Sequence, residues 1–256
     1  MSDRVTNPFD LSGRTALVTG ANTGIGQAIA VSLARAGADI VVVGRTAPDE
    51  TAAAVQAIGR KFTALNVDLS DVAHASEVIR ATTTRGITVD ILVNNAGIIR
   101  RADALDFTES DWDAVMNVNL KSAFFLSQAA AREMIRSGRG GKIINIASML
   151  SFQGGIRVAS YTASKSAIAG LTRLLANEWA SKGINVNAIA PGYVATNNTT
   201  ALRADETRNR EILARIPAGR WAKPEDIGGA AVFLASDAAS YIHGTILPVD
   251  GGWLAR

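Results

Sequence analysis

Seven short apolar runs recur along the chain, separated by stretches with helical periodicity. The runs are TALVTG (15–20), DIVVVG (39–44), KFTALNVD (61–68), DILVNNAG (90–97), KIINIAS (142–148), INVNAIAPG (184–192) and TILPVDGG (245–252). Most are continuously apolar, which is typical of strands buried on both faces of a parallel sheet. The alternation therefore predicts a doubly wound α/β fold with about seven parallel strands and helices on both faces.

The stretches between the runs carry apolar residues at intervals of three and four. Three of them are marked by Ile25, Ile29 and Leu33, by Trp112, Val115, Met116, Ala123, Leu126 and Ala130, and by Ile168, Leu171, Leu175 and Trp179. No linker interrupts this pattern, so we expect a single domain over residues 1–256. The longest irregular part, 192–223, is polar, and we expect it to form an inserted helical lid or loop over the substrate.

Composition and charge exclude several classes of protein. The 256 residues are 48% hydrophobic and include no cysteine, which excludes disulfides, while His74 and His243 lie in no metal-binding motif, so we expect no metal. The net charge is only +3 and the basic residues are scattered, so we expect no nucleic-acid partner. No apolar run has membrane-spanning length and MSDRVTNPFDLSGR lacks a signal peptide's apolar core, so we expect a cytoplasmic protein without membrane contact.

Two glycine-bearing loops predict a nucleotide site. TGANTGIG follows the first run and brings Gly20, Gly24 and Gly26 to a strand-to-helix turn, where the backbone and the helix N-terminus can approach a pyrophosphate. The spacing differs from G-x-G-x-x-G, but the position favours a dinucleotide site over a simple tight turn. NNAG (94–97) ends the fourth run, and strands one and four flank the crevice of such a sheet. We expect the two loops to form its walls.

The residue after the second run bears on the choice of dinucleotide. An acidic residue there would accept the ribose hydroxyls of NAD, whereas this chain has Gly44-Arg45-Thr46. Arg45 can face a 2′-phosphate, which favours NADP(H) over NAD(H). The alternative is a solvated arginine.

Tyr161 and Lys165 are four residues apart, so they share one helix face. A nearby ammonium favours the phenolate, so we expect Lys165 to lower the pKa of Tyr161 and make it a general acid or base. The alternative is a chance pair on a solvated helix. Ser148 ends the fifth run and can hold a carbonyl oxygen in the crevice, or serve only as a turn residue.

Asn119 continues the inward stripe of its helix, and a buried amide needs partners. We expect either a kinked helix with an ordered water that links to Lys165, or a satisfied structural asparagine. Together with the loops, these residues predict hydride transfer to or from a carbonyl, with nicotinamide as the hydride carrier. Tyr161 would transfer the proton, Ser148 would hold the oxygen, and Lys165 would also bind the nicotinamide ribose.

The motifs TGANTGIG, NNAG, NVNL, YTASK and PGYVAT (191–196), together with Ser148, resemble the Rossmann-type short-chain dehydrogenase/reductases over the whole chain. The resemblance implies a catalytic tetrad of Asn119, Ser148, Tyr161 and Lys165, and a homotetramer. The dinucleotide contacts expected from the loops and the resemblance are Gly20, Asn22, Thr23, Gly24, Ile25, Gly26, Arg45, Asp68, Leu69, Asn95, Ala96, Gly97, Tyr161, Lys165, Pro191, Gly192, Val194 and Thr196.

Further segments, among them NAGIIRR, INIASMLSFQGGIRV and VDGGWLAR, are similar to the family's subgroup that acts on 2-dehydro-3-deoxy-D-gluconate or 2-deoxy-D-gluconate. This implies a keto sugar acid as substrate, and that subgroup is associated mainly with NAD(H), against the indication from Arg45. The expected substrate contacts are Ser148, Gln153, Arg157, Tyr161 and Asn197, with Asn198 and Trp221 as further candidates.

A carboxylate favours an arginine fork, so we expect at least one of Arg100, Arg101 and Arg157 to bind it; the alternative for each is a surface or interface ion pair. Within the family, the alternative activities are those of a 3-oxoacyl carrier-protein reductase and a gluconate 5-dehydrogenase. Outside enzymes, the alternative is a non-catalytic nucleotide sensor on the same fold.

Overall fold

The computed structural model describes residues 7–256, and its sheet has the predicted doubly wound form. Seven parallel strands lie in the order β3-β2-β1-β4-β5-β6-β7, so the chain reverses direction across the sheet between β1 and β4. The strands are β1 Thr15–Thr19, β2 Asp39–Gly44, β3 Phe62–Asn66, β4 Ile91–Asn94, β5 Gly141–Ile146, β6 Ile184–Pro191 and β7 Ile246–Val249. Each of the seven apolar runs thus contains one strand.

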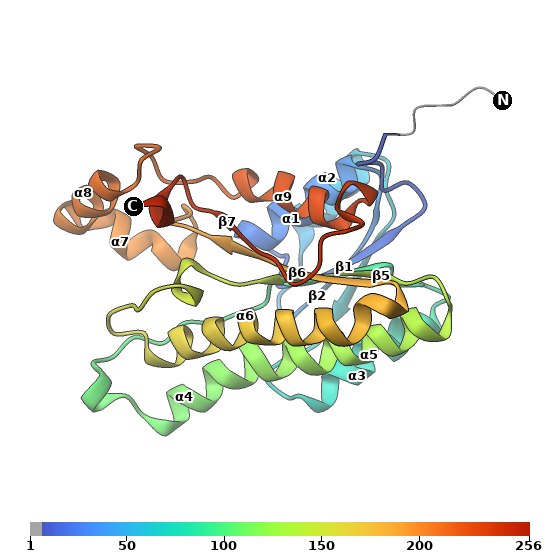
Figure 1. The fold of residues 1–256 in the computed structure, drawn as a ribbon, viewed down its shortest axis with the longest axis horizontal. Helices are drawn as coiled ribbons and strands as arrows, with labels where there is room; N and C mark the ends of the chain where they lie inside the picture. Colours follow the sequence, from blue (N-terminus) through green and yellow to red (C-terminus); the bar gives the residue numbers. More distant parts are fainter. Residues whose placement is uncertain (1–6) are drawn as a thin grey trace.

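Helices cover both faces of the sheet (Figure 1). One layer contains α1 Gly24–Arg35, α2 Asp49–Ala57 and α9 Glu225–Ala235; the other contains α3 Ala73–Thr84, α4 Glu109–Met116, α5 Ser122–Arg136 and α6 Ala159–Trp179. Ala16 and Val18 belong to the core beneath the first layer, whereas Leu17 belongs to the core beneath the second. All three are fully buried, which is why the strands read as continuously apolar.

A π-helical turn, Asn117–Lys121, separates α4 from α5. The sequence predicted one apolar stripe through this region and offered a kinked helix as one way to satisfy the buried amide of Asn119. The structure has a π-helical turn at this place. The Ser122 hydroxyl donates to the Val118 carbonyl at 2.7 Å within it. Such turns are frequent at functional sites because they redirect a side chain without ending the helix.

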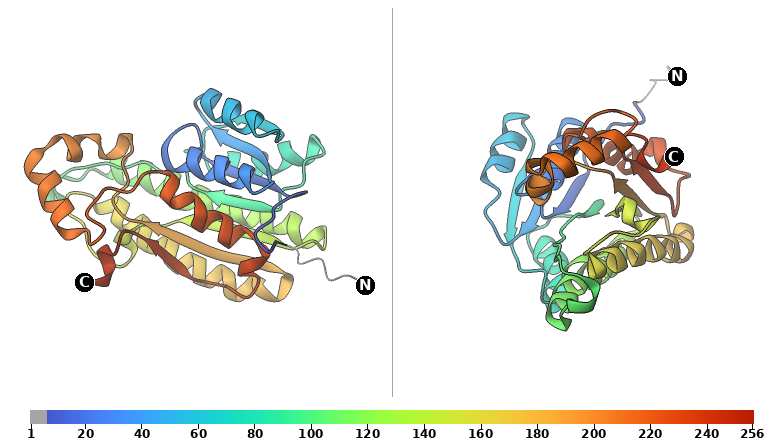
Figure 2. Two further views of the ribbon diagram at one scale, coloured as in Figure 1. Left: turned by 90° about the horizontal axis from the view of Figure 1, so that it is seen from above. Right: turned by 90° about the vertical axis from the view of Figure 1, so that its left-hand side faces the viewer.

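The polar segment 192–223 is helical, as predicted, and lies beyond the carboxyl end of β6 (Figure 2). It contains a 3₁₀ turn, Asn197–Thr199, followed by α7 Thr200–Ala204 and α8 Glu206–Arg215. Ile212 of α8 and Ile216, the residue after its end, pack against Met149 and Trp253. The far end of the chain therefore supports this segment.

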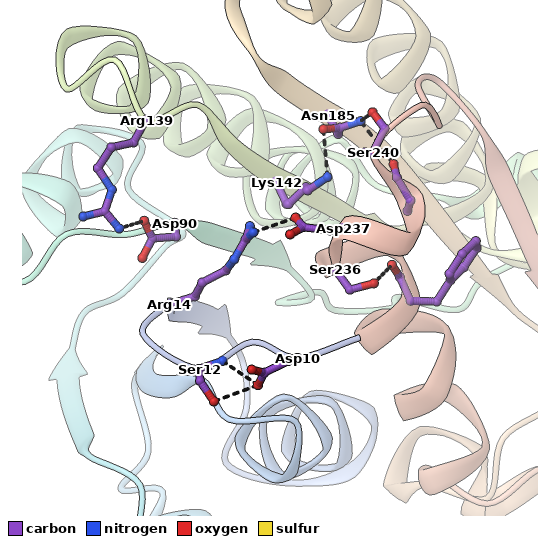
Figure 3. Close-up of polar contacts among 12 residues, drawn as sticks. Asp10, Ser12, Arg14, Asp90, Arg139, Lys142, Asn185, Ser236, Asp237 and Ser240 are labelled. Atoms are coloured by element: carbon purple, nitrogen blue, oxygen red, sulfur yellow. Dashed lines mark hydrogen bonds and ion pairs between the residues drawn. The ribbon is translucent and has the colours of Figure 1, made fainter. Parts of the chain in front are cut away.

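Paired polar groups occupy the opposite, amino-terminal edge of the sheet (Figure 3). Arg139 pairs with Asp90 at 2.6 Å, and Arg14 lies 2.6 Å from a carboxylate oxygen of Asp237. The buried Lys142 donates to Asn185 at 2.9 Å, and burial, followed by the charge of Arg14, lowers its pKa. These groups satisfy one another, so we assign them to stability.

Gly228 sets the distance between α1 and α9. A Cβ at this position would collide with the Ser32 hydroxyl and lie 2.8 Å from Ser32 Cβ, whereas a Cβ at Gly229 meets nothing within 4 Å. We expect Gly228→Ala to lower the free energy of unfolding by about 1–3 kcal/mol. The matched Gly229→Ala should leave it unchanged or raise it by about 0.5–1 kcal/mol. Urea unfolding at one protein concentration measures both, and equal stabilities would contradict this account of the α1–α9 contact.

Candidate active site

A cavity of about 610 Å³ opens at the carboxyl ends of the strands, beside the loops that follow the neighbouring strands β1 and β4. Seventeen of the predicted site residues line it: Gly20, Asn22, Thr23, Gly24, Ile25, Gly26, Arg45, Asp68, Leu69, Asn95, Ala96, Gly97, Tyr161, Lys165, Thr196, Asn197 and Asn198. Loops far apart in sequence therefore converge on one site, at the place where doubly wound sheets bind their ligands.

Hydrogen bonds tie the two glycine-bearing loops together. Asn95 Nδ2 donates to the carbonyls of Thr19 and Gly20 at 2.9 and 3.0 Å. The Thr19 hydroxyl accepts from the backbone N–H groups of Asn95 and Ala96 at 3.0 and 2.9 Å. A Cβ on Gly26 would collide with Asn95 Nδ2 and the Gly20 carbonyl. Only glycine at position 26 allows this close junction.

The first turn of α1 carries the features of an anion site. Gly20 and Gly24 have φ of 63° and 61°, a backbone conformation that glycine adopts without strain. The N-cap residue Thr23 makes no side-chain capping bond, and the first turn contains no acidic residue. The backbone N–H groups and the helix dipole are therefore offered to the cavity, which suits a phosphate.

Arg45 and Asp68 lie at another part of the cavity wall. Their closest atoms, Arg45 Nη1 and Asp68 Oδ2, are 3.9 Å apart, and the Arg45 side chain is 68% exposed. Hydrogen bonds from Ser70 hold the pKa of Asp68 below its ordinary value. Because its ion pair is long and exposed, Arg45 keeps most of its donors for a ligand.

Lys165 is buried on the inner face of α6. Its Nζ donates to the Ile146 carbonyl at 2.6 Å and lies 5.6 Å from the centroid of the Tyr161 ring. Burial lowers the pKa of Lys165 to about 8. The side chain is therefore mainly an ammonium at neutral pH.

The pKa of Tyr161 is raised, which corrects the expectation from the sequence. Burial is the largest cause, and a hydrogen bond with Ser148 and the charge of Arg101 oppose it. The expectation that Lys165 lowers this pKa is wrong for this structure. The ammonium lies over the ring and is bonded to Ile146, so burial outweighs charge at the hydroxyl.

Ser148 caps the 3₁₀ turn Met149–Ser151 that follows β5. Its hydroxyl accepts from the Leu150 N–H at 3.2 Å, and its interaction with the phenol acts to lower the pKa of Tyr161. Ser151 fixes the turn to α6, because its hydroxyl donates to the Lys165 carbonyl at 2.6 Å. Ser148 is thus both a turn residue and a partner of the phenol, although it does not form the cavity wall.

Asn119 holds the loop after β4 against α6. Its Oδ1 accepts from the Ile98 N–H at 2.8 Å, while Nδ2 donates to the Ile98 carbonyl at 3.0 Å and to Ser164 Oγ at 3.3 Å. Protein groups therefore satisfy the buried amide of Asn119. One of them, Ser164, precedes Lys165 in the chain. The water link remains a prediction.

Several other predicted residues lie off the cavity wall. Gln153 Oε1 accepts from Trp253 Nε1 at 3.2 Å and from Arg215 at 3.3 Å. Arg157 has a φ of 63° and pairs with Asp103 at 3.2 Å on the surface. Three residues predicted at the nicotinamide also lie off the wall. Pro191 ends β6, Val194 is buried, and Gly192 packs so closely on Asp250 that a Cβ at this position would lie 2.6 Å from Asp250 Cα.

The wall also contains residues that the sequence reasoning missed, among them Glu50, Thr46, Ser70, Ile98, Val118, Ile146 and Pro224. Ile146 precedes Ser148 by two residues, so the strand-end argument could have found it. Glu50 and Pro224 come from the beginnings of α2 and α9, which no motif marked. Within residues 7–256, no group of three His, Cys, Asp or Glu side chains is placed to hold a metal ion, and none of the helices has the length and apolarity to cross a membrane.

Comparisons with known proteins agree with this geometry. The family model described as enoyl-(acyl carrier protein) reductase matches residues 20–254. The chain is 63% identical to 2-dehydro-3-deoxy-D-gluconate 5-dehydrogenase of Dickeya dadantii, over 98% of this chain and all of that one, and 59% identical to the Escherichia coli K12 protein of the same name, with the same coverage.

A crystal structure from Agrobacterium tumefaciens, described as a candidate 2-deoxy-D-gluconate 3-dehydrogenase with bound NADP, superposes with a TM-score of 0.94 at 64% identity. It covers 98% of this chain and all of that one. Sequence, sheet order and site geometry agree with the motif resemblance, and the chain belongs to the short-chain dehydrogenase/reductase family of oxidoreductases.

Proposed function

We propose that this chain is an NAD(P)(H)-dependent dehydrogenase of a keto-deoxy sugar acid, of the 2-dehydro-3-deoxy-D-gluconate 5-dehydrogenase or 2-deoxy-D-gluconate 3-dehydrogenase type. One observation carries the proposal: Tyr161 and Lys165 line the same cavity as the glycine loop and the NNAG loop. A proton donor is therefore placed beside a dinucleotide site. The names of the Dickeya and Agrobacterium relatives support the substrate class.

The cavity fits a dinucleotide. Gly26 has no room for a Cβ, and the N-terminus of α1 offers uncapped N–H groups for the pyrophosphate. Asp68 and Leu69 would contact the adenine, Asn95–Gly97 its ribose, and the segment 191–196 the nicotinamide, with Thr196 on the wall. Arg45 would bind a 2′-phosphate, so we propose NADP(H) as the preferred form. When bound, the nicotinamide supplies or accepts the hydride.

Asn119, Ser148, Tyr161 and Lys165 have different roles in the proposed reaction. In reduction, the Tyr161 hydroxyl gives its proton to the substrate oxygen, and in oxidation it takes the proton back. Ser148, whose interaction with the phenol lowers the pKa of Tyr161, holds that oxygen. The Lys165 ammonium binds the nicotinamide ribose, and Asn119 fixes the Ile98 backbone beside it. A raised pKa keeps Tyr161 protonated at neutral pH, which suits proton donation to a ketone.

We also propose that the helical segment 192–223 is a substrate lid and that the chain works as a homotetramer in the cytoplasm. Asn197 and Asn198, at the beginning of the segment, line the cavity. The helices α4–α6 expose Trp112, Phe125 and Leu174, by 39 to 47% of their surface. Exposed apolar side chains on neighbouring helices favour self-association.

The test of the activity is oxidation of 2-dehydro-3-deoxy-D-gluconate and of D-gluconate with NADP⁺ and NAD⁺, beside reduction of an acetoacetyl thioester with NADPH and NADH. We propose the highest kcat/KM for the keto-deoxy acid. A preference for gluconate or for the thioester would instead support the two alternatives within the family. Binding of NADPH without turnover of any of the three would support the sensor.

Tyr161→Phe removes only the hydroxyl. We expect it to lower kcat by about 10²–10⁴-fold, because general acid–base catalysis has this size. The dissociation constant of NADPH, measured by its fluorescence, should change less than about threefold, since the ring remains. Tyr241→Phe is the matched control, because Tyr241 is 97% exposed. Parent-like turnover of Tyr161→Phe would end the proposal.

Arg45→Ala removes the predicted phosphate partner. We expect the dissociation constant of NADPH to rise at least about tenfold and that of NADH to change less than about threefold, since only NADPH loses a charge-assisted bond. The control is Arg80→Ala, an exposed arginine on α3. Equal weakening of both dinucleotides would contradict the role of Arg45.

The buried Lys165 predicts a specific pH dependence of stability. Its folded-state pKa, about 8, is below the ordinary value of 10.5, so the unfolded chain binds more protons between these values. Stability therefore rises with pH across that window. In a Tyr161→Phe background, Lys165 should raise the free energy of unfolding by about 2 kcal/mol between about pH 7.5 and about pH 9.5. Adding Lys165→Met should remove this contribution. Urea unfolding measures the difference, and parallel pH curves would show that Lys165 is not so perturbed.

A further inference from the structure

Two of the three arginines that the sequence offers for the substrate carboxylate already face a carboxylate of this chain. Arg100 Nε is 3.1 Å from Asp111, and Arg157 Nε is 3.2 Å from Asp103. An anionic ligand at either arginine would meet the like charge of the neighbouring aspartate. Arg101 has no carboxylate partner among residues 7–256.

Arg101 extends from the loop after β4 to the proposed lid. Its Nη2 donates to the Asn198 carbonyl at 3.2 Å, and Asn198 lines the cavity together with Tyr161. A guanidinium has five N–H donors in a planar fork. One bond to a neutral carbonyl leaves most of that fork for a ligand at the mouth.

The charge of Arg101 also reaches the reacting group. It is the arginine that acts on the Tyr161 hydroxyl, where it favours the phenolate. No arginine of the proposed lid has this effect on Tyr161, and one of them, Arg215, stacks on Trp253 at 4.0 Å. Arg101 is therefore the positive charge that borders both the lid and the proton donor.

We propose that Arg101 binds the carboxylate of the sugar acid and selects acids over neutral polyols and ketones. The inference rests on the proposed function and deepens it. The carboxylate takes the open side of the guanidinium, as a charge-assisted and bidentate pair, while Nη2 keeps the Asn198 carbonyl. One side chain then holds the acid end of the substrate and the beginning of the lid, and places the rest of the molecule toward Tyr161.

The test compares 2-dehydro-3-deoxy-D-gluconate with its uncharged methyl ester in the full-length enzyme. We expect Arg101→Gln to raise KM for the acid by about 10–150-fold, the size of a hydrogen bond to a charged group. KM for the ester should change less than about threefold, and Arg101→Lys should restore part of the selectivity, because an ammonium keeps the charge without the fork. Arg100→Gln is the matched control, with both substrates unchanged.

A binding measurement keeps the test independent of turnover. Calorimetric titration with D-gluconate and with D-glucitol, at saturating NADP⁺, should show selective binding of the acid by the parent and loss of that selectivity in Arg101→Gln. If Arg101→Gln raises KM for the acid and for the ester equally, if it keeps the parent's preference for gluconate over glucitol, or if Arg157→Gln alone loses the acid, the assignment of Arg101 is overturned. Parent enzyme that selects gluconate but turns over no keto acid would retain the carboxylate site and reject the proposed reaction.

Discussion

The junction between the loops after β1 and β4 is the constraint on which the rest of the site depends. The sheet reverses there, and four hydrogen bonds among Thr19, Gly20, Asn95 and Ala96 join the loops. These bonds require that position 26 has no side chain. Asn119 extends the junction through Ile98 to α6, the helix that carries Tyr161 and Lys165. The two glycine-bearing loops and the helix that carries the proposed proton donor therefore belong to one hydrogen-bonded frame.

Burial determines the acid–base character of this frame. The same enclosure raises the pKa of Tyr161 and lowers that of Lys165 to about 8, because charge is disfavoured in both side chains. A neutral phenol and an ammonium are the forms that follow at neutral pH. The carbonyl of Ile146 holds that ammonium in place, so the lysine is positioned by the end of β5 and not by the tyrosine.

The sequence predicted what depends on local pattern. All seven strands were found because strands buried on two faces read as unbroken apolar runs, and most of the cavity wall followed from the ends of those strands. Contacts between distant segments were not predictable. Gln153 was expected at the substrate but is held by Trp253, a hundred residues away, and the direction of the Tyr161 pKa depends on enclosure that no motif encodes.

The hydrogen bonds of Gln153 show how the segment after β5 is connected to α8 and to the end of the chain. Its Oε1 receives bonds from Trp253 and from Arg215 of α8, and Arg215 stacks on the same tryptophan. Met149, one residue after Ser148, packs in this cluster. Trp253 thus links the turn that Ser148 caps to α8 of the proposed lid. Because Arg101 donates to the Asn198 carbonyl at the other end of this segment, the proposed lid is attached at both ends, and a carboxylate bound at Arg101, as we propose, would act on the lid and on Tyr161 together.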